Sequence, residues 1–420
     1  MAFHKGDVTL SEVEGSCIMQ GKSQQIHIAG KGAISAIGNN VAENFASLRN
    51  LQTGVSKITV LTTRYAETLP AAEVKLTNEE LAARCGLNSN EPRTALFSLI
   101  AAKEAVTDAN IPDFKKWRTG FVSANTVGAM DKTETIYKYF MEDGNTNKLI
   151  EEDPYDAGYV TELVANELGI KEHITTISTA CSSSANAMAY GARLIKSNQL
   201  DIVVAGGCDA MSRFTLNGFN SLMILDTNPC TPYDDNRKGL NLGEGAGYVV
   251  LVSEKVAATL SKKPTTTLSG YANANDAFHQ TASSPEGKGN FMAMQGALEM
   301  SGLAAKDIDY INLHGTGTPN NDLSEGIAVQ RIFGAVPKAS STKPYTGHTL
   351  GACAGIEAVY CILSIENGII FPNLRFQTKM KELDFTPVTE LLQNIEVNHV
   401  MSNSFGFGGN CSSVIFSKAN

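Results

Sequence analysis

The stretch Thr175-Thr176-Ile177-Ser178-Thr179-Ala180-Cys181-Ser182-Ser183-Ser184 places one cysteine between the pattern of a short strand and the start of a helix. Residues 175–178 are rich in β-branched side chains, which favour a strand, and the small residues that follow Cys181 predict a long helix. A helix N-terminus offers free N–H groups and partial positive charge, which lower the pKa of a nearby thiol. We therefore expect Cys181 to be a nucleophile, whereas a scattered cysteine is ordinarily a small core residue.

The second half of the chain repeats this plan. Residues 308–313 have the pattern of a strand that ends at His314, and His348 precedes a helix over residues 349–367 that begins with small residues. Small residues allow a helix to lie deep between layers, so we expect both small-residue helices to be central. The pattern predicts a duplicated α/β unit, packed back to back.

Other segments fit the same α/β fold class. We expect helices over residues 40–49 and 95–110, and strands over residues 25–30, 120–124, 201–207, 248–253, 397–402 and 412–416. The charged break Lys262-Lys263-Pro264 predicts a boundary. The predicted organisation is an N-terminal extension over residues 1–25, a first half over 26–262 that carries the cysteine, and a second half over 263–420 that carries both histidines.

Composition limits the possible functions. A chain of 420 residues that is 43% hydrophobic buries a large core, and the sequence has no run of about 18 apolar residues that could span a membrane. A net charge of −9 argues against nucleic-acid binding. The eight cysteines are scattered without a C-x-x-C pair, which is typical of free thiols in a reducing cytoplasm.

Two histidine loops complete the candidate site. They read His314-Gly315-Thr316-Gly317-Thr318-Pro319 and Lys343-Pro344-Tyr345-Thr346-Gly347-His348. A cysteine with a positioned histidine forms acyl intermediates, and the second histidine is available for a second step. Two histidines also suggest a metal site, but no His-x-x-x-His or carboxylate spacing surrounds them, so we expect no metal.

These three loops resemble the active-site motifs of the β-ketoacyl-acyl-carrier-protein synthases, the condensing enzymes of the thiolase superfamily. Two further motifs belong to the resemblance, Asn241-Leu242-Gly243-Glu244-Gly245-Ala246-Gly247 and Asn403-Ser404-Phe405-Gly406-Phe407-Gly408-Gly409. It extends from Ile26 to Phe416. It implies a thiolase-like fold, with two similar α/β halves in five layers. It also implies a 3-oxoacyl-acyl-carrier-protein synthase, which condenses an acyl chain held on Cys181 with a malonyl-carrier thioester as carbon dioxide leaves.

The resemblance also assigns roles to single residues. It implies that His314 and His348 donate hydrogen bonds to the thioester carbonyl of the malonyl group. The backbone N–H groups of Cys181 and Phe407 match the family's oxyanion hole, and the Phe407 side chain matches its gate. The remaining matches are a buried ion pair between Lys343 and Glu357, loop braces at Asp322 and Glu325, phosphopantetheine contacts at Thr316 and Thr318, and acyl-pocket residues Leu240 and Phe405. Apart from the resemblance, His279 is a secondary candidate for lining the entrance.

Departures from the family pattern leave the substrate open between fatty-acid, aryl-polyene and other polyketide-type synthesis. Three serines follow Cys181 in place of the Ala-Thr-Gly of many fatty-acid enzymes. The alternatives are a non-elongating subunit of a heterodimeric synthase, a thiolase that uses Cys411 as its second cysteine, and an initiating synthase with Cys, His and Asn. The complete set of Cys181, His314 and His348 disfavours the first and third, and the His314 loop disfavours the thiolase.

The resemblance implies an acyl carrier protein as partner, with the phosphopantetheine arm arriving on that carrier and no further cofactor. It also implies a homodimer, or a heterodimer with a chain-length-factor-like subunit. The resemblance implies that the acidic carrier docks near residues 81–93, where Arg84 and Arg93 provide positive charge. Other candidate contributors are Lys132, Lys138, Arg213 and the Arg237-Lys238 pair. A helical excursion over residues 132–149 is expected to cover the pocket.

Overall fold

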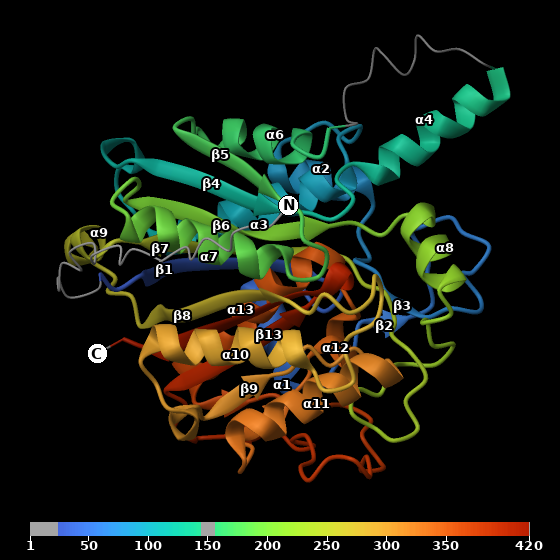
Figure 1. Cartoon of the computed structure of the whole chain (residues 1–420). Helices are drawn as coiled ribbons and strands as arrows, with labels where there is room; N and C mark the ends of the chain where they lie inside the picture. The colour runs from blue at the N-terminus through green and yellow to red at the C-terminus, as the bar shows by residue number, and fades with distance from the viewer. Residues whose placement is uncertain (1–23, 144–155, 420) are drawn as a thin grey trace, which may run out of the picture.

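The computed structural model describes residues 24–143 and 156–419, so most of the predicted N-terminal extension lies outside the described residues. Ten strands form one sheet in the order β10-β9-β13-β14-β8-β1-β7-β6-β4-β5. In Figure 1 the labelled strands of this sheet extend from β5 at the top to β9 near the bottom. Their bounds are β1 (His27–Ser35), β4 (Thr119–Ala124), β5 (His173–Ile177), β6 (Ile202–Asp209), β7 (Gly245–Val252), β8 (Thr266–Asn275), β9 (Tyr310–Asn312), β10 (Lys338–Ser340), β13 (His399–Phe405) and β14 (Asn410–Lys418).

The sheet consists of two five-stranded groups with the same topology. In the first group β4, β5 and β6 run parallel, while β7 and β1 continue the sheet antiparallel. In the second group β9, β10 and β13 run parallel, while β14 and β8 are antiparallel. The pairs His27–Thr267 and Ile28–Thr266 join the two groups. The duplicated α/β architecture is therefore confirmed, while the division into domains at residue 262 stays a prediction.

Helices complete a five-layered arrangement. The central layer holds α7 (Ser183–Lys196) and α13 (Cys353–Asn367), which contact each other and strands of both groups. The outer layers hold α3 (Arg93–Ala109) and α6 (Tyr159–Leu168) over the first group, and α10 (Lys288–Ser301) with α11 (Pro319–Phe333) over the second. Both small-residue helices are thus central, as the sequence predicts.

The close packing of α13 depends on glycine. A Cβ atom on Gly247 of β7 would lie 2.3 Å from the backbone of Gly355 in α13, so neither position has room for a side chain. The segment Leu350–Asn367 is long and apolar enough to cross a membrane, but 89% of it is buried inside the fold. It is therefore a core helix.

Smaller elements lie around this body. They are α1 (Val41–Arg49), β2 (Val55–Ser56), β3 (Ala71–Ala72), α2 (Asn78–Cys85), α4 (Met130–Asp143), α8 (Arg213–Ser221), α9 (Glu254–Thr259), α12 (Lys343–Thr346), β11 (Ile369–Ile370) and β12 (Leu392–Gln393). Figure 1 shows α4 projecting from the body at the upper right, with α8, β2 and β3 below it.

The predicted strand over residues 25–30 was too short. The strand does not end at Gly30, because β1 continues to Ser35 with an irregular register between Ile28 and Gly30. A Cβ atom on Gly30 would lie 2.2 Å from the carbonyl oxygen of Ala105 in α3. The glycines of β1 therefore make room for a helix across the strand rather than a turn.

Candidate active site

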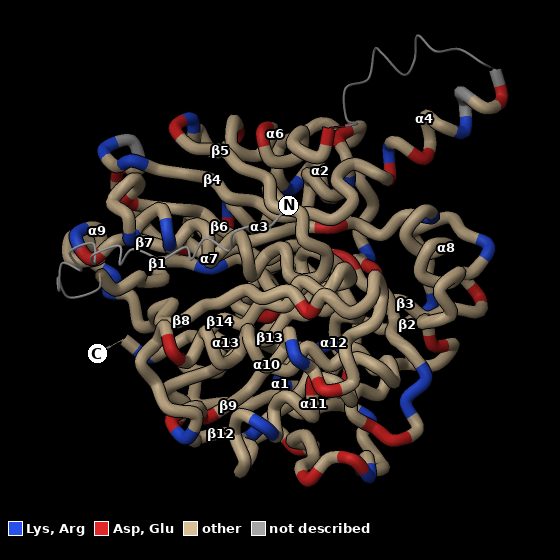
Figure 2. The backbone as a smooth tube through the Cα atoms, viewed as in Figure 1, with Lys and Arg blue, Asp and Glu red and all other residues tan. Residues whose placement is uncertain are grey.

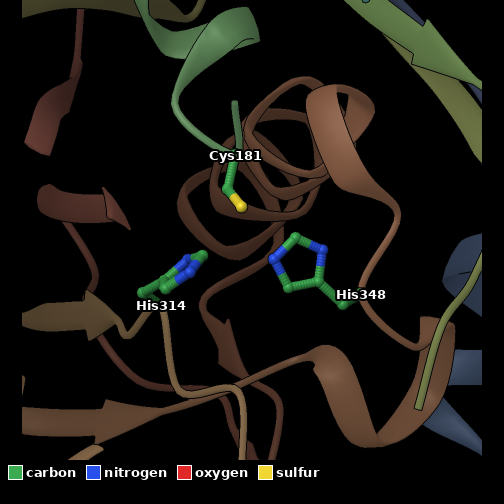
Figure 3. A group of neighbouring side chains, drawn as sticks. All are labelled: Cys181, His314 and His348. Atoms are coloured by element: carbon green, nitrogen blue, oxygen red, sulfur yellow. The ribbon is translucent and has the colours of Figure 1, made fainter. Parts of the chain in front are cut away.

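The three reactive side chains follow parallel strands. Cys181 follows β5, His314 follows β9, and His348 follows β10 and the short helix α12. The sulfur of Cys181 and one ring nitrogen of each histidine all lie within 4.8 Å of one another. Figure 3 shows the sulfur pointing toward the space between the two imidazole rings. The structure thus brings together residues that are far apart in the sequence.

The turn that carries Cys181 is tightly fastened. Ala180 has a φ angle of 54°, a left-handed conformation that residues with a side chain rarely adopt. The Ser183 hydroxyl accepts from the N–H of Thr179 at 2.8 Å and donates to the carbonyl of Ala180 at 2.5 Å. The Ser182 hydroxyl donates to the carbonyl of Thr179 at 2.7 Å. The serines after the cysteine therefore hold the nucleophile's backbone.

The expectation of a lowered cysteine pKa was wrong. Burial raises the pKa of the Cys181 thiol to about 11, although the Lys343 charge and the N–H groups of Phe407 and Cys181 act in the opposite direction. A helix terminus contributes at most about 2 kcal/mol, or about 1.5 pKa units. The sequence reveals the helix terminus but not the burial, which leaves the residue only 7% exposed. The resting residue is a thiol.

His348 is held as a neutral hydrogen-bond donor. Its Nδ1 accepts from the N–H of Leu350 at 3.0 Å. Burial and the nearby Lys343 charge lower the pKa of His348 to about 3. A neutral imidazole that accepts at Nδ1 carries its proton on Nε2. His348 therefore presents an Nε2–H donor.

His314 is held in the same tautomer by a different contact. Its Nδ1 lies 3.4 Å from the Nζ of Lys343, and an ammonium group only donates. Burial, together with the Lys343 charge and His348, lowers the pKa of His314 well below its usual value. The two rings lie edge to face with centroids 5.5 Å apart. The site thus holds two neutral Nε2–H donors beside one thiol.

The same proton positions argue against a metal ion. The three ligand atoms are close enough to share an ion. A metal at Nε2 would need the proton to move to Nδ1, where Lys343 Nζ and the Leu350 N–H already point. The donor set therefore does not fit a metal.

Lys343 and Glu357 form a buried ion pair, as the resemblance implies. Their Nζ and Oε1 atoms are 2.8 Å apart, and their side chains are 1% and 3% exposed. Lys343 also donates to the carbonyl of His314 at 2.5 Å. Burial acts to lower the pKa of Lys343, but the combined effects of Glu357, Cys353 and Glu325 outweigh it, and the pKa is raised. The pair therefore connects α13 to the His314 loop.

Two carboxylates brace the His314 loop from α11. Glu325 accepts from the N–H groups of His314 at 2.8 Å and Gly315 at 2.9 Å. Asp322 accepts from the N–H groups of Thr316 at 2.9 Å and Gly317 at 3.1 Å. The bracing expected from the motif is present.

A cavity of about 220 Å³ opens onto this site. The predicted residues that line it are Cys181, Leu240, His314, Thr316, Thr318, His348, Phe405 and Phe407. His279 does not line it. This side chain is exposed and its Nδ1 accepts from the N–H of Thr281, so the following segment, Thr281 to Ser283, lines the cavity instead.

The described part of the expected pocket cover does not line the cavity. The described helix α4 contributes no residue to the cavity wall, while the rest of the predicted cover, residues 144–149, lies outside the described residues. Phe219 of α8, which the sequence analysis missed, contributes to the wall. Its ring stacks on Phe407 with centroids 5.9 Å apart and 19° between the planes. No local motif marks Phe219, because its stacking contact depends on the position of the distant loop that carries Phe407.

The two arginines proposed for docking differ in role. Arg93 is only 6% exposed and forms an ion pair of 2.7 Å with Glu244, so its prediction as a docking residue was wrong. Arg84 is exposed on α2. Local hydrogen bonds lower the pKa of Glu43 in α1, and the charge of Arg84 makes a smaller contribution in the same direction. Neither residue lines the cavity.

Cys411 does not take part in the site. Its buried thiol donates to Asn290 Oδ1 at 3.2 Å, and the residue does not line the cavity. The thiolase alternative is therefore disfavoured, because its second cysteine would have to be Cys411, which does not line the cavity.

A buried cysteine and two imidazole donors at the centre of this duplicated fold define a condensing enzyme with thiolase-like architecture. Residues 23–257 match Beta-ketoacyl synthase, N-terminal domain, and residues 265–377 match Beta-ketoacyl synthase, C-terminal domain. The chain therefore belongs to the beta-ketoacyl synthase family.

Individual relatives agree with this assignment. The 3-oxoacyl-[acyl-carrier-protein] synthase 2 of Staphylococcus aureus is 32% identical, with 94% of this chain and 99% of the relative covered. The solved ishigamide ketosynthase/chain length factor has a TM-score of 0.88 at 29% identity, covering 95% of this chain and 100% of that one. The ketosynthase ApeO from Xenorhabdus doucetiae, in complex with its chain length factor ApeC, has a TM-score of 0.81 at 29% identity, covering 94% and 98%.

Proposed function

We propose that this chain condenses an acyl group held on Cys181 with a malonyl-acyl-carrier protein and releases a 3-oxoacyl-carrier protein. The observation that carries the proposal is the pair of neutral Nε2–H donors beside the buried thiol, since one ring nitrogen of each histidine lies within 4.8 Å of its sulfur. Donors fixed toward developing negative charge are worth about 2.7–4 kcal/mol each. The complete set of three groups disfavours a non-elongating partner subunit.

The first half-reaction transfers the acyl group. The sulfur of Cys181 attacks the carbonyl of an acyl-carrier thioester, a C–S bond forms, and the bond to the carrier sulfur breaks. The thiol proton leaves with the departing carrier thiol. The N–H groups of Cys181 and Phe407, which act to lower the pKa of the Cys181 thiol, are assigned to receive the oxyanion.

The second half-reaction forms the carbon–carbon bond. The malonyl carboxylate leaves as carbon dioxide, and the two Nε2–H groups of His314 and His348 stabilise the enolate oxygen. The enolate carbon attacks the acyl carbonyl on Cys181, and the C–S bond breaks. The Cys181 thiolate then takes one proton from solvent, which restores the resting thiol.

Cavity residues receive the substrate. We assign Thr316 and Thr318 to the phosphopantetheine arm because their hydroxyls are 2.9 Å apart at the cavity wall. Leu240 and Phe405 provide apolar surface for the acyl chain, and Phe407 acts as the gate. The enzyme uses no cofactor beyond the arm carried by its substrate, and we place it in the cytoplasm.

Carrier docking is better placed beside α8 than at residues 81–93. A surface groove of about 850 Å³ is lined by Arg64, Arg213 and uncharged polar side chains. Arg64 is exposed, whereas Arg213 also contacts Glu134 at 3.0 Å. Residues of α8 line this groove, while Phe219 of the same helix lines the cavity. Figure 2 shows basic segments scattered among acidic ones, so a small local site suits an acidic carrier better than a broad basic face.

A second subunit is part of the proposal. Strand β5 is at the end of the sheet order, and edge strands pair readily. The solved relatives include two ketosynthases with chain length factors. We propose a homodimer, with a chain-length-factor-like subunit as the alternative partner. Light scattering of the purified chain distinguishes a dimer from a monomer. Co-purification with a second subunit distinguishes the heterodimer from the homodimer.

Intact-mass spectrometry tests the reaction. Wild-type protein incubated with a panel of acyl-carrier proteins should gain an acyl adduct that Cys181→Ala lacks. His314→Ala and His348→Ala should keep the adduct but lose malonyl decarboxylation and condensation by about 10²-fold or more. Persistence of the adduct in Cys181→Ala, or equal loss of both half-reactions in the histidine variants, would contradict the assignment.

A further inference from the structure

The turn after His348 is held by two side chains from the other half of the fold. The N–H of Gly351 donates to Oδ2 of Asp209 at 2.7 Å. The carbonyl of Gly351 accepts a hydrogen bond from the hydroxyl of Ser184. Asp209 ends β6, and Ser184 is three residues beyond the nucleophile Cys181. The backbone of Gly351 is therefore held at both its N–H group and its carbonyl group.

The surroundings leave this turn little freedom. A Cβ atom on Gly351 would lie 2.8 Å from Oδ2 of Asp209 and 3.0 Å from the side chain of Thr126. The preceding Leu350 has a φ of 54°, which an unrestrained residue with a side chain avoids. The N–H of this same Leu350 donates to His348 Nδ1. The fixed turn therefore sets the direction of the N–H that decides the tautomer of His348.

Asp209 is an unusual residue for a purely structural contact. It is fully buried, and its carboxylate also accepts from the N–H and the hydroxyl of Thr126 at 3.0 and 2.8 Å. Within residues 24–143 and 156–419, no lysine, arginine or histidine forms an ion pair with it. A buried carboxylate without a cation is costly. Its hydrogen bonds to two loops beside the site give a reason for its presence.

We infer that Asp209 and Ser184 are positioning residues that keep the proton of His348 on Nε2 by clamping Gly351. Neither side chain lines the cavity, so both act through the Leu350 N–H and not on substrate. Because Ser184 belongs to the helix that starts beside Cys181, the same contact also sets the separation of the nucleophile and His348. This inference rests on the proposed role of His348 as a donor to the enolate.

Kinetics of the two half-reactions test the clamp. Asp209→Ala should lower kcat for malonyl-carrier decarboxylation by about 10- to 100-fold, with KM and the rate of Cys181 acylation within about 3-fold of wild type. Asp209→Asn keeps an acceptor oxygen for Gly351 and should recover much of this loss. Ser184→Ala, which removes one neutral hydrogen bond, should lower decarboxylation up to about 10-fold. The matched control is Ser364→Ala, since that buried hydroxyl donates to a helix carbonyl of Tyr360.

A spectroscopic measurement separates this clamp from the proposed function. In ¹⁵N-histidine-labelled enzyme, with His348 assigned by the spectrum of His348→Gln, wild type should show a protonated Nε2 and an unprotonated Nδ1. Asp209→Ala should shift this signal toward the other tautomer or an average, while Asp209→Asn should not. Unchanged His348 signals in Asp209→Ala and Ser184→Ala would overturn the inference, even if no condensation is found. Equal loss of acylation and decarboxylation in Ser184→Ala would also overturn it.

Discussion

Replacing Lys343 by methionine should separate the contribution of the buried ion pair to stability from its contribution to catalysis. Lys343 is 1% exposed and its Nζ lies 2.8 Å from Glu357, whose Oε2 has no hydrogen-bond partner within the described residues. Lys343→Met leaves a buried carboxylate without its cation, which costs about 3–5 kcal/mol of unfolding free energy. Glu357→Gln leaves a buried ammonium group and should cost a similar amount.

The double variant Lys343→Met/Glu357→Gln should regain much of that stability because no buried charge is left. It should not regain activity, since Lys343 also holds the carbonyl and Nδ1 of His314. Losing one oriented donor corresponds to about 10²–10³ in the condensation rate. Acylation of Cys181 should fall by less than about tenfold. The reason is that burial dominates the thiol pKa, and the Lys343 charge offsets only part of the increase.

Urea unfolding and the two half-reaction rates together decide the outcome. If the two single variants lose stability additively in the double variant, the side chains are not energetic partners. If the double variant condenses within about threefold of wild type, the contact of Lys343 with His314 is dispensable and our tautomer argument fails. The variant Lys338→Met, on an exposed residue of β10, controls for the loss of a lysine.

Three further predictions concern the thiol and the docking site. Iodoacetamide alkylation of Cys181 should rise about tenfold per pH unit from pH 7 to 9, because a thiol with a pKa of about 11 is protonated throughout this range; a plateau below pH 8 would refute this. Cys411→Ala should leave acyl loading within about twofold, since that thiol lies outside the cavity, and loss of loading by mass spectrometry would revive the thiolase alternative. Arg64→Glu and Arg213→Glu should raise the apparent KM for carrier-bound substrate, and the increase should be larger at low salt than at high salt. The kinetics with a small thioester mimic should not change, and Arg84→Glu should leave both substrates unaffected. An equal effect on both substrates would indicate that these arginines act in folding.

The reactive residues could be predicted because each has a local signal. Cys181, His314 and His348 stand in loops of glycine, serine or threonine beside recognisable strands and helices, and the repeat of strand, loop and small-residue helix indicates the duplication. Local motifs also carry the partners that brace them, since Asp322 and Glu325 lie within eleven residues of His314. These features depend on short stretches of chain, which a sequence displays directly.

Failures occurred where the decisive neighbour is distant. Arg84 and Arg93 stand in one predicted segment, yet only Arg93 meets Glu244, which is 151 residues away. For the same reason His279 was wrongly expected to line the cavity and Phe219 was missed, because the cavity wall depends on how the loop that carries Phe407 meets α8. Surface charge and pocket lining are tertiary properties, so composition near a motif is a poor guide to them.

The chemistry of the histidines is the clearest case of information that only the structure provides. In the sequence, two histidines beside a cysteine suit a general base as well as a hydrogen-bond donor. The contacts of Lys343 and the Leu350 N–H at the two Nδ1 atoms place both protons on Nε2, so neither ring faces the sulfur with a free lone pair. A base is therefore not available at the thiol, and its proton has to leave with the departing carrier. It follows that the histidines act mainly in decarboxylation and that the two half-reactions should respond separately to substitution.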